Sequence, residues 1–423
     1  MPIQSVFPAL EQLLPFVQKP VQYVGGELNA VVKPWDDVTV RWVLMYPDAY
    51  EVGIPNQGVQ ILYEVLNERA DTLCERTYAV WPDLEALMRE NSVSQFTLET
   101  HRPVGAFDLF GLSFATELGY TNMLTAIDLA GVPIHAVDRD ETHPLVVAGG
   151  HAAFNPEAIA DFIDCAVIGD GEQAVLAITD IVADFKRGGS VGGRHELLLR
   201  LAKSGVVYVP QFYDVEYLED GRIRRVAPNQ PGVPFRVAKH TVSNLDEWPY
   251  PKAPLVPLAE SVHERMSVEI FRGCTRGCRF CQAGMITRPV RERPAEQVRT
   301  MVEEGLRRTG YDEVALTSLS TADFSGIEKL VGDIVQSTDD GPPVSVSLPS
   351  LRVDAFGVGI ATQIQRARRT GLTFAPEAGT WRMRQVINKL IREEDLYSAV
   401  EAAYANGWRR VKLYFLTGLP TET

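Results

Sequence analysis

Three of the five cysteines in this chain lie in one short stretch, at Cys274, Cys278 and Cys281. The stretch follows an apolar run, residues 266–271, that predicts a strand. Two glycines beside the cysteines add little bulk, so the loop can bring three thiolates to one object. Clustered thiolates bind zinc or an iron–sulfur cluster. A structural zinc site needs four ligands and this loop offers three, so the pattern favours a [4Fe–4S] cluster with one open iron. A zinc site or chance clustering is the alternative.

The spacing Cys-x3-Cys-x2-Cys, with the aromatic residue Phe280 before the third cysteine, resembles the signature of the radical SAM superfamily. The resemblance implies that Cys274, Cys278 and Cys281 hold the cluster and that S-adenosylmethionine chelates the open iron. It also implies the reaction. The cluster donates an electron, a C–S bond of the cofactor breaks, and the resulting 5′-deoxyadenosyl radical abstracts a hydrogen atom from a substrate. We therefore expect an enzyme.

The composition indicates a globular protein of more than one domain. A chain of 423 residues usually forms two or three domains. No apolar stretch reaches the ~20 residues of a membrane span, and the N-terminus lacks the pattern of a secretory signal. Five cysteines with three clustered do not make a disulfide framework, so we expect Cys74 and Cys165 to be buried thiols. These features predict a cytoplasmic protein without a membrane partner.

The formal charge of −14 is unevenly distributed. Residues 262–423 carry 22 basic and 20 acidic side chains, so residues 1–261 carry the remaining 19 basic and 35 acidic ones. The acidic first part should bind nucleic acid poorly. Several arginines near the cysteines predict either a solvated rim with ion pairs or a site for an anionic substrate or the cofactor's carboxylate. These arginines are Arg276, Arg279, Arg288, Arg291 and Arg293.

Strand and helix patterns alternate between residues 36 and 190. Strands are expected at 38–46, 73–80, 108–114, 145–148 and 165–168, with helical segments between them and a last helix to about residue 186. The alternation predicts a parallel, doubly wound α/β sheet. Ligands of such sheets bind beyond the carboxyl ends of the strands.

The flanking segments have other patterns. Residues 1–35 show no sustained period and predict an irregular lead-in. Within 191–261, alternating runs at 206–216 and 222–226 predict a hairpin, and eight prolines between Pro210 and Pro257 predict an extended connector.

Periodic patterns return in residues 262–423. Strands are expected at 313–317, 344–348, 372–375 and 410–415, and helices at 295–308, 324–336 and 360–369. Chemistry in the loop after the first strand of such a run is typical of a barrel-like parallel sheet that works at its C-terminal edge. This part resembles the partial (β/α) barrel of the radical SAM core, with about five units present.

The first part resembles the flavodoxin-like, cobalamin-binding domain that precedes the core in B12-binding radical SAM proteins. Residues 46–53, 149–151, 375–380 and 417–422 are similar to one uncharacterised branch of that group. The resemblance implies cobalamin as a further cofactor and methyl transfer as an extension of the chemistry. A low-bulk rim for the corrin would come from glycines at the strand ends: Gly53, Gly58, Gly119, Gly149, Gly150 and Gly171.

A lower histidine ligand is not expected for this cobalamin. The Asp-x-His-x-x-Gly motif that supplies such a ligand in many cobalamin domains is absent. His151 is the only histidine in a strand-end loop of a suitable kind. The alternative for His151 is a hydrogen-bonded histidine at a domain contact, and the alternative for the domain is a sheet that only supports the barrel.

Further cofactor-binding residues follow from the radical SAM resemblance. Residues 317–320 take the place of the family's Gly-Gly-Glu segment, which binds the cofactor's amino group, and depart from it in sequence. Ser318 and Ser320 would substitute there, and Phe280 would lie near the adenine. Ser345, Ser347 and Glu377 would reach the ribose or methionine moieties. The alternative for each serine is a core-facing hydroxyl, and the alternative for Glu377 is an exposed loop carboxylate.

Three basic residues also have two alternative roles. Arg382, Arg384 and Lys412 would bind a carboxylate or phosphate, or else form surface salt bridges. The resemblance also implies a reducing partner such as flavodoxin or ferredoxin. The sequence does not identify the substrate.

Two other functions share parts of this sequence pattern. A methylthiotransferase needs a further cysteine-bound cluster in its N-terminal domain, and Cys74 and Cys165 are too few. A non-catalytic iron–sulfur or cobalamin-binding sensor, or an electron-transfer protein, is the alternative to an enzyme. Because the chain stops at Thr423, after the fifth expected barrel strand, we expect a form truncated within the barrel, poorly soluble or weakly active alone.

Overall fold

A computed structural model describes residues 4–337, 344–349, 352–353 and 372–423. The chain forms two compact units. Unit 1 comprises Met1–Val242, Pro249–Pro251 and Leu255–His263, and unit 2 comprises the remaining residues to Thr423. None of the described helices is long and apolar enough to cross a bilayer.

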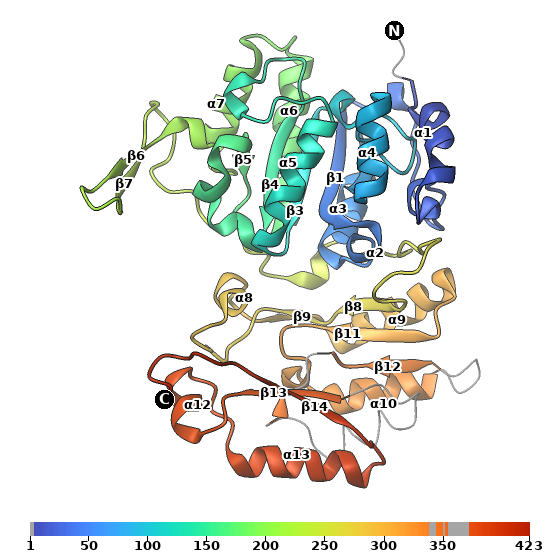
Figure 1. Cartoon of the computed structure of the whole chain (residues 1–423), viewed down its shortest axis with the longest axis vertical. Helices are drawn as coiled ribbons and strands as arrows, with labels where there is room; N and C mark the ends of the chain where they lie inside the picture. The colour runs from blue at the N-terminus through green and yellow to red at the C-terminus, as the bar shows by residue number, and fades with distance from the viewer. Residues whose placement is uncertain (1–3, 338–343, 350–351, 354–371) are drawn as a thin grey trace. The chain divides into compact units, whose positions relative to one another are not determined.

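Unit 1 is built on a five-stranded parallel sheet (Figure 1). The strand order is β2-β1-β3-β4-β5, which is the order of the flavodoxin-like fold. The predicted doubly wound class is therefore confirmed. The strands are β1 (Val40–Ala49), β2 (Thr72–Ala79), β3 (Leu109–Phe114), β4 (Leu145–Gly150) and β5 (Cys165–Ala166).

Helices cover both faces of this sheet. Side chains alternate along β1, so Trp42 and Leu44 belong to one core while Val43 and Met45 belong to another. The first core contains α3, α6 and α7, and the second contains α5. The helices of unit 1 are α1 (Phe7–Leu13), α2 (Tyr50–Gly53), α3 (Gln57–Asn67), α4 (Pro82–Asn91), α5 (Tyr120–Leu129), α6 (Gly171–Arg187) and α7 (Gly193–Ser204).

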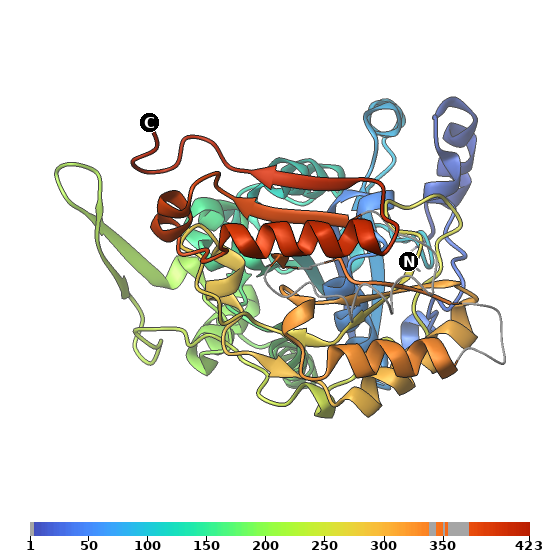
Figure 2. The same ribbon diagram turned by 90° about the horizontal axis from the view of Figure 1, so that it is seen from below.

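The structure corrects the prediction for residues 191–261 in two places. Helix α7 was not expected there, and its Leu197, Leu198 and Leu201 are buried in the first core. The hairpin is shorter than predicted because Tyr208 instead extends the sheet: its N–H donates to the Ala166 carbonyl at 2.8 Å. The hairpin strands are β6 (Tyr213–Tyr217) and β7 (Ile223–Pro228), which project from unit 1 in both views (Figures 1 and 2).

A buried group of charges, the Arg76 cluster (Arg76, Glu27 and Glu99), joins the lead-in to the sheet. The Arg76 side chain on β2 is fully buried and lies 5.3 Å from the centre of the Tyr63 ring. Its Nε donates to Glu99 at 2.6 Å and its Nη2 donates to Glu27 at 3.2 Å. Buried charges are tolerated when they are paired, so this cluster fixes Glu27 of the lead-in against β2.

A second buried carboxylate, Glu75, lies next to Arg76 in sequence. It accepts hydrogen bonds from the hydroxyl groups of Thr97 at 2.5 Å and Thr100 at 2.7 Å. Burial, and then the charge of Glu99, raise the pKa of Glu75 from 4.5 to about 7. The folded state thus binds this proton more tightly than the unfolded state does.

We therefore expect Glu75 to make stability fall as pH rises. The contribution is fully present below the unfolded pKa of 4.5 and is lost through the folded pKa of about 7, a change of roughly 3 kcal/mol. Glu75→Gln should flatten this part of the pH profile in denaturant unfolding. The control is Glu90→Gln, an exposed glutamate on α4. An unchanged profile in Glu75→Gln would contradict the prediction.

Unit 2 has parallel strands and helices in alternation. Strands β12, β11 and β8 form one parallel sheet in that order, and β13 pairs with β14 in parallel. In both views α13 runs along the β13–β14 pair (Figures 1 and 2). The predicted helix at 360–369 lies outside the described residues. The elements are β8 (Met266–Glu269), β9 (Phe271–Arg272), α8 (Gln282–Ile286), β10 (Arg291–Glu292), α9 (Ala295–Thr309), β11 (Glu313–Thr317), α10 (Ile327–Ser337), β12 (Ser345–Ser347), β13 (Leu372–Glu377), α12 (Trp381–Val386), α13 (Glu393–Ala405) and β14 (Val411–Phe415).

Candidate functional site

The three clustered cysteines lie on the loop between β9 and α8. This loop needs glycine at two points. Gly273 has a φ of 96°, and an added Cβ would lie 2.5 Å from the Pro289 carbonyl oxygen. Gly277 has a φ of 70°, which other residues rarely adopt. The glycines are therefore required by the path that carries the cysteines.

Two of the cysteines face the same small space. The Gly284 N–H donates to Cys281 Sγ at 3.3 Å, and the Arg276 N–H donates to Cys274 Sγ at 3.5 Å. A Cβ added to Gly284 would lie 3.4 Å from Cys281 Sγ and 3.8 Å from Cys274 Cβ. N–H donors to sulfur stabilise thiolates and tune a bound iron–sulfur cluster. Sulfur donors with these amide contacts fit a [4Fe–4S] cluster.

The geometry does not suit a single metal ion. Within the ranges that the structure describes, no three Cys, His, Asp or Glu side chains gather as ligands of one ion. In a [4Fe–4S] cluster each cysteine binds a different iron, so the sulfurs converge on one cube but lie further apart than the ligands of a single ion. Half-buried Cys278 completes the set of three thiols on this loop.

Arginine side chains hold the backbone around the cysteines. Arg288 Nε donates to the Cys274 carbonyl at 3.3 Å, and Arg279 Nη1 donates to the Val386 carbonyl at 2.5 Å. Arg291 binds the Thr287 carbonyl at 2.8 Å. Buried Arg293 binds the Leu245 carbonyl and lies 3.8 Å from Glu269. Arg276 and Arg293 thus form ion pairs, as one of the two predicted alternatives has it. The other three arginines bind backbone carbonyls, which neither alternative included.

The segment after β11 is joined to the cysteine loop through Asp323. Its carboxylate accepts a hydrogen bond from Arg276 Nε at 2.9 Å and from Ser320 Oγ at 2.7 Å. Ser318 Oγ lies 3.1 Å from Thr321 Oγ1. Burial pushes the pKa of Asp323 up, but the hydrogen bonds from Arg276 and Ser320 outweigh it, so the net pKa lies below its ordinary value. The predicted Ser318 and Ser320 therefore lie on a segment fixed to the cysteine loop.

A third segment, after α12, also contacts the loop. Asn388 Nδ2 donates to the Gly277 carbonyl at 2.8 Å, and the Arg279 N–H donates to the Ile387 carbonyl at 3.0 Å. Sequence reasoning missed Asp323 and Asn388. An Asp six residues after the end of β11 is a weak signal in the sequence. Asn388 gives no signal, because its φ of 55° is known only from the folded chain.

The remaining predicted cofactor residues have different surroundings. Phe280 is 46% exposed, so its ring is open to a ligand. Glu377 ends β13 with a φ of 65° and forms an ion pair with Lys389 at 2.9 Å. Such a strained backbone is frequent at functional sites. Ser347 is buried, and its hydroxyl accepts from Arg265, which precedes β8, at 3.3 Å.

The three basic candidates toward the C-terminus contact the chain itself. Buried Arg384 donates to the carbonyls of Ala378 at 2.8 Å and Ile391 at 3.0 Å. Arg382 binds Thr421 at 2.7 Å, and Lys412 lies 4.7 Å from the centre of the Tyr414 ring.

The predicted corrin rim in unit 1 has another explanation. A Cβ on Gly53 would lie 2.4 Å from the Tyr78 ring, and one on Gly150 would lie 2.3 Å from the Phe114 carbonyl oxygen. Gly119 and Gly171 are similarly close to Pro47 and Leu62, at 2.7 and 3.0 Å. Internal packing thus explains Gly53, Gly119 and Gly150, whereas the contact at Gly171 is with the flexible end of the Leu62 side chain. His151 is half-buried directly after β4.

The two remaining cysteines are buried, as predicted. Cys74 and Cys165 have no exposed surface, and burial raises the pKa of both thiols. A thiol held protonated in an apolar core is a poor metal ligand. Neither residue offers a second cluster site.

We expect Asp323 to affect how firmly the cysteine loop holds a cluster. Asp323→Ala removes the anchor of Arg276, so the rate of cluster loss to a chelator should rise about tenfold, as for other outer-shell changes. The measurement is the decay of cluster absorbance after anaerobic reconstitution. The matched control is Asp333→Ala, an exposed aspartate on α10. Equal decay rates in the two variants would contradict this role.

Two known protein families match this chain. Residues 58–210 match the family "Radical SAM proteins, N-terminal", and residues 268–423 match the family "Radical SAM superfamily". An uncharacterised protein of Methanocaldococcus jannaschii is 27% identical over 384 residues, which cover 90% of this chain and 70% of that protein.

Two solved structures have a similar fold. The radical S-adenosylmethionine methyltransferase TsrM of Kitasatospora setae, solved with cobalamin and a [4Fe–4S] cluster, matches with a TM-score of 0.58 and 15% identity, over 90% of this chain and 70% of that one. The cobalamin-dependent S-adenosylmethionine radical enzyme OxsB, solved with aqua-cobalamin and S-adenosylmethionine, matches with a TM-score of 0.54 and 14% identity, over 90% and 49%. With both family matches and this fold, the chain belongs to the radical SAM superfamily.

Proposed function

We propose that this protein is an enzyme that holds one [4Fe–4S] cluster on Cys274, Cys278 and Cys281 and reductively cleaves S-adenosylmethionine. The observation that carries the proposal is a loop of three thiols, with amide N–H groups on two of the sulfurs, joined through Asp323 to the end of the next parallel strand. When bound, the cluster would supply the electron that generates a 5′-deoxyadenosyl radical.

The chain's own groups would position the cofactors. The amides of Arg276 and Gly284 donate to cysteine sulfurs, and exposed Phe280 offers a ring for the adenine. Ser318, Ser320 and the backbone beside them would bind the amino group in place of the family's Gly-Gly-Glu segment. Glu377 and Ser347 stay proposals for the ribose and methionine moieties.

The test is anaerobic reconstitution with iron and sulfide, followed by reduction with dithionite and addition of S-adenosylmethionine. Formation of 5′-deoxyadenosine by the parent protein, and none by Cys278→Ala, would support an enzyme. A stable, reducible cluster that produces no 5′-deoxyadenosine would favour the electron-transfer or sensor alternative. A cytoplasmic flavodoxin or ferredoxin is the proposed physiological reductant.

We also propose that unit 1 binds cobalamin without a histidine lower ligand and that methyl transfer to an unidentified substrate follows. The support is the fold shared with TsrM and OxsB and the five-stranded sheet whose carboxyl ends suit a ligand. The glycines at these strand ends add little support, because packing explains three of them.

Titration of the full chain with hydroxocobalamin tests this second proposal. Saturable binding with spectra unchanged by His151→Ala is expected. Loss of an imidazole-type spectrum in that variant would make His151 a ligand. No binding would leave unit 1 as a support for the barrel.

A further inference from the structure

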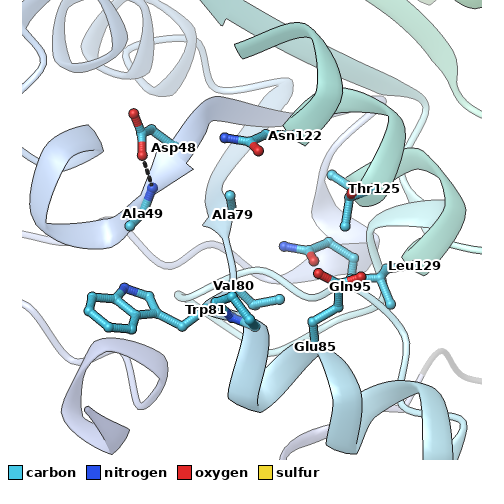
Figure 3. Close-up of a pocket in the computed structure, with 12 residues that line it drawn as sticks. Asp48, Ala49, Ala79, Val80, Trp81, Glu85, Gln95, Asn122, Thr125 and Leu129 are labelled. Carbon is cyan, nitrogen blue, oxygen red and sulfur yellow. Dashed lines mark hydrogen bonds between the residues drawn. The ribbon is translucent and has the colours of Figure 1, made fainter. Parts of the chain in front are cut away.

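A cavity of about 280 Å³ lies in unit 1 where β1 and β2 end. Its walls come from the ends of both strands, from α4, from α5 and from the segment that contains Gln95 (Figure 3). This size is at the lower end of ligand sites. A whole corrin is larger than this volume, so the cavity by itself would not hold a cobalamin.

Gln95 leaves an unpaired acceptor at this cavity. The residue is 1% exposed, and its Nε2 donates to Thr77 Oγ1 at 2.7 Å and to the Tyr78 carbonyl at 2.8 Å. A carbonyl only accepts, so these contacts fix which end of the amide is nitrogen. The Oε1 atom has no hydrogen-bond partner within the described part of the chain. Figure 3 shows this side chain extending into the space between Ala79, Thr125 and Glu85.

A buried acceptor without a donor is costly. Native structures normally satisfy such an atom with a protein group, an ordered water or a ligand. A ligand here must therefore bring a hydrogen-bond donor to Gln95 Oε1.

The charge of the lining selects a cation. Asp48 and Glu85 line the cavity, and its described lining contains no Lys, Arg or His. Glu85 Oε1 forms an ion pair with Arg89 Nε at 3.0 Å. Asp48 Oδ1 accepts a hydrogen bond from the Ala49 N–H at 2.7 Å, and Asp48 forms no described ion pair. Residues 1–261 carry 19 basic and 35 acidic side chains, so the surrounding field also attracts cations.

The rest of the lining fits a short apolar body. Val80, Ala126 and Leu129 contribute aliphatic surface, and Trp81 adds an aromatic side chain. Thr125 and Asn122 contribute polar groups, and Asn122 Nδ2 is occupied by the Pro47 carbonyl at 3.0 Å. The site therefore combines acceptors and negative charge with a small apolar wall.

We propose that this cavity binds a small protonated amine, whose N–H group donates to Gln95 Oε1 and whose charge is balanced by Asp48 and Glu85. The proposal concerns unit 1 alone and does not depend on a bound cluster or cobalamin. Water filling is the competing explanation, and binding measurements separate the two.

The test is isothermal titration of the full chain, without cofactors, with phenethylamine and with its neutral isostere 2-phenylethanol. We expect phenethylamine to bind with a Kd of about 1 mM or tighter and the alcohol to bind at least about tenfold more weakly. The double variant Asp48→Asn with Glu85→Gln should lose this preference. The matched control is Asp184→Asn, whose side chain on α6 is 73% exposed.

Gln95→Met should also weaken amine binding, because it removes the acceptor oxygen but keeps a side chain of similar length. If that variant fails to fold, the two carboxylate changes still decide the question, since Asp48 is exposed and Glu85 is 30% exposed. No saturable amine binding, equal binding of amine and alcohol, or unchanged amine affinity in the carboxylate variant would each overturn the proposal and leave the cavity to water.

Discussion

Replacing any one of Cys274, Cys278 and Cys281 by alanine is expected to abolish the broad visible absorbance and the spin-resonance signal of a reconstituted cluster. In the proposed arrangement each thiolate would hold one iron, and the described residues contain no group of three Cys, His, Asp or Glu that could replace a lost ligand. A cluster reduced to two protein ligands should be lost rather than weakened. Iron and sulfide per chain should fall to the background of the unreconstituted protein.

The chain provides its own control for this experiment. Cys74→Ala and Cys165→Ala also remove a cysteine, but from the buried core of unit 1. Both variants should keep the full iron and sulfide content, although each loses some packing. A triple alanine variant of the loop that retained its full iron and sulfide would refute the cluster assignment, and so would equal losses in the Cys74 and Cys165 variants.

The sequence predicted this site because its information is local. Cys274, Cys278 and Cys281 lie on one loop, and their spacing is visible without a fold. What joins the loop to its surroundings is not local: Asp323 lies beyond β11 and Asn388 lies beyond β13, so both meet the loop only in the folded chain. The same limit applies to the arginines, whose carbonyl partners cannot be read from their spacing.

The fold was predictable where hydrophobic period and burial agree. Strands β1 to β5 are apolar runs separated by helical patterns, and they form the expected parallel sheet. Helix α7 was missed because glycines precede it and the prolines that follow suggested a connector. Its leucines at 197, 198 and 201 have helical spacing, and Gly205 ends the helix with a φ of 72°. That leucine pattern was the available signal.

The Arg76 cluster had no signal in the sequence. Arg76 lies within a strand pattern, and its partners Glu27 and Glu99 come from a lead-in and a loop. Nothing in their spacing predicts contact. A charged residue in a strand usually indicates an exposed face, yet here pairing across the fold permits complete burial of the side chain.

The Arg76 cluster leads to the second large expected effect. Arg76→Met keeps much of the side chain's volume but leaves Glu27 and Glu99 buried without their cation. Breaking a buried pair in this way costs about 3–5 kcal/mol, which should appear as a large drop in the denaturant midpoint of unfolding. The loss of unfolding free energy should be smaller at low pH, because protonated carboxyl groups need no counter-charge.

The same substitution at an exposed arginine separates burial from charge. Arg89 also forms two ion pairs, with Glu85 and Asp128, but its side chain is 45% exposed, so Arg89→Met should cost less than about 1 kcal/mol. Adding Glu27→Gln and Glu99→Gln to Arg76→Met should restore part of the lost stability, because those changes remove the unpaired charges. Two outcomes would mean that the cluster acts through packing rather than through buried charge. One is an equal loss of unfolding free energy in Arg76→Met and Arg89→Met, and the other is no recovery of stability in the triple variant.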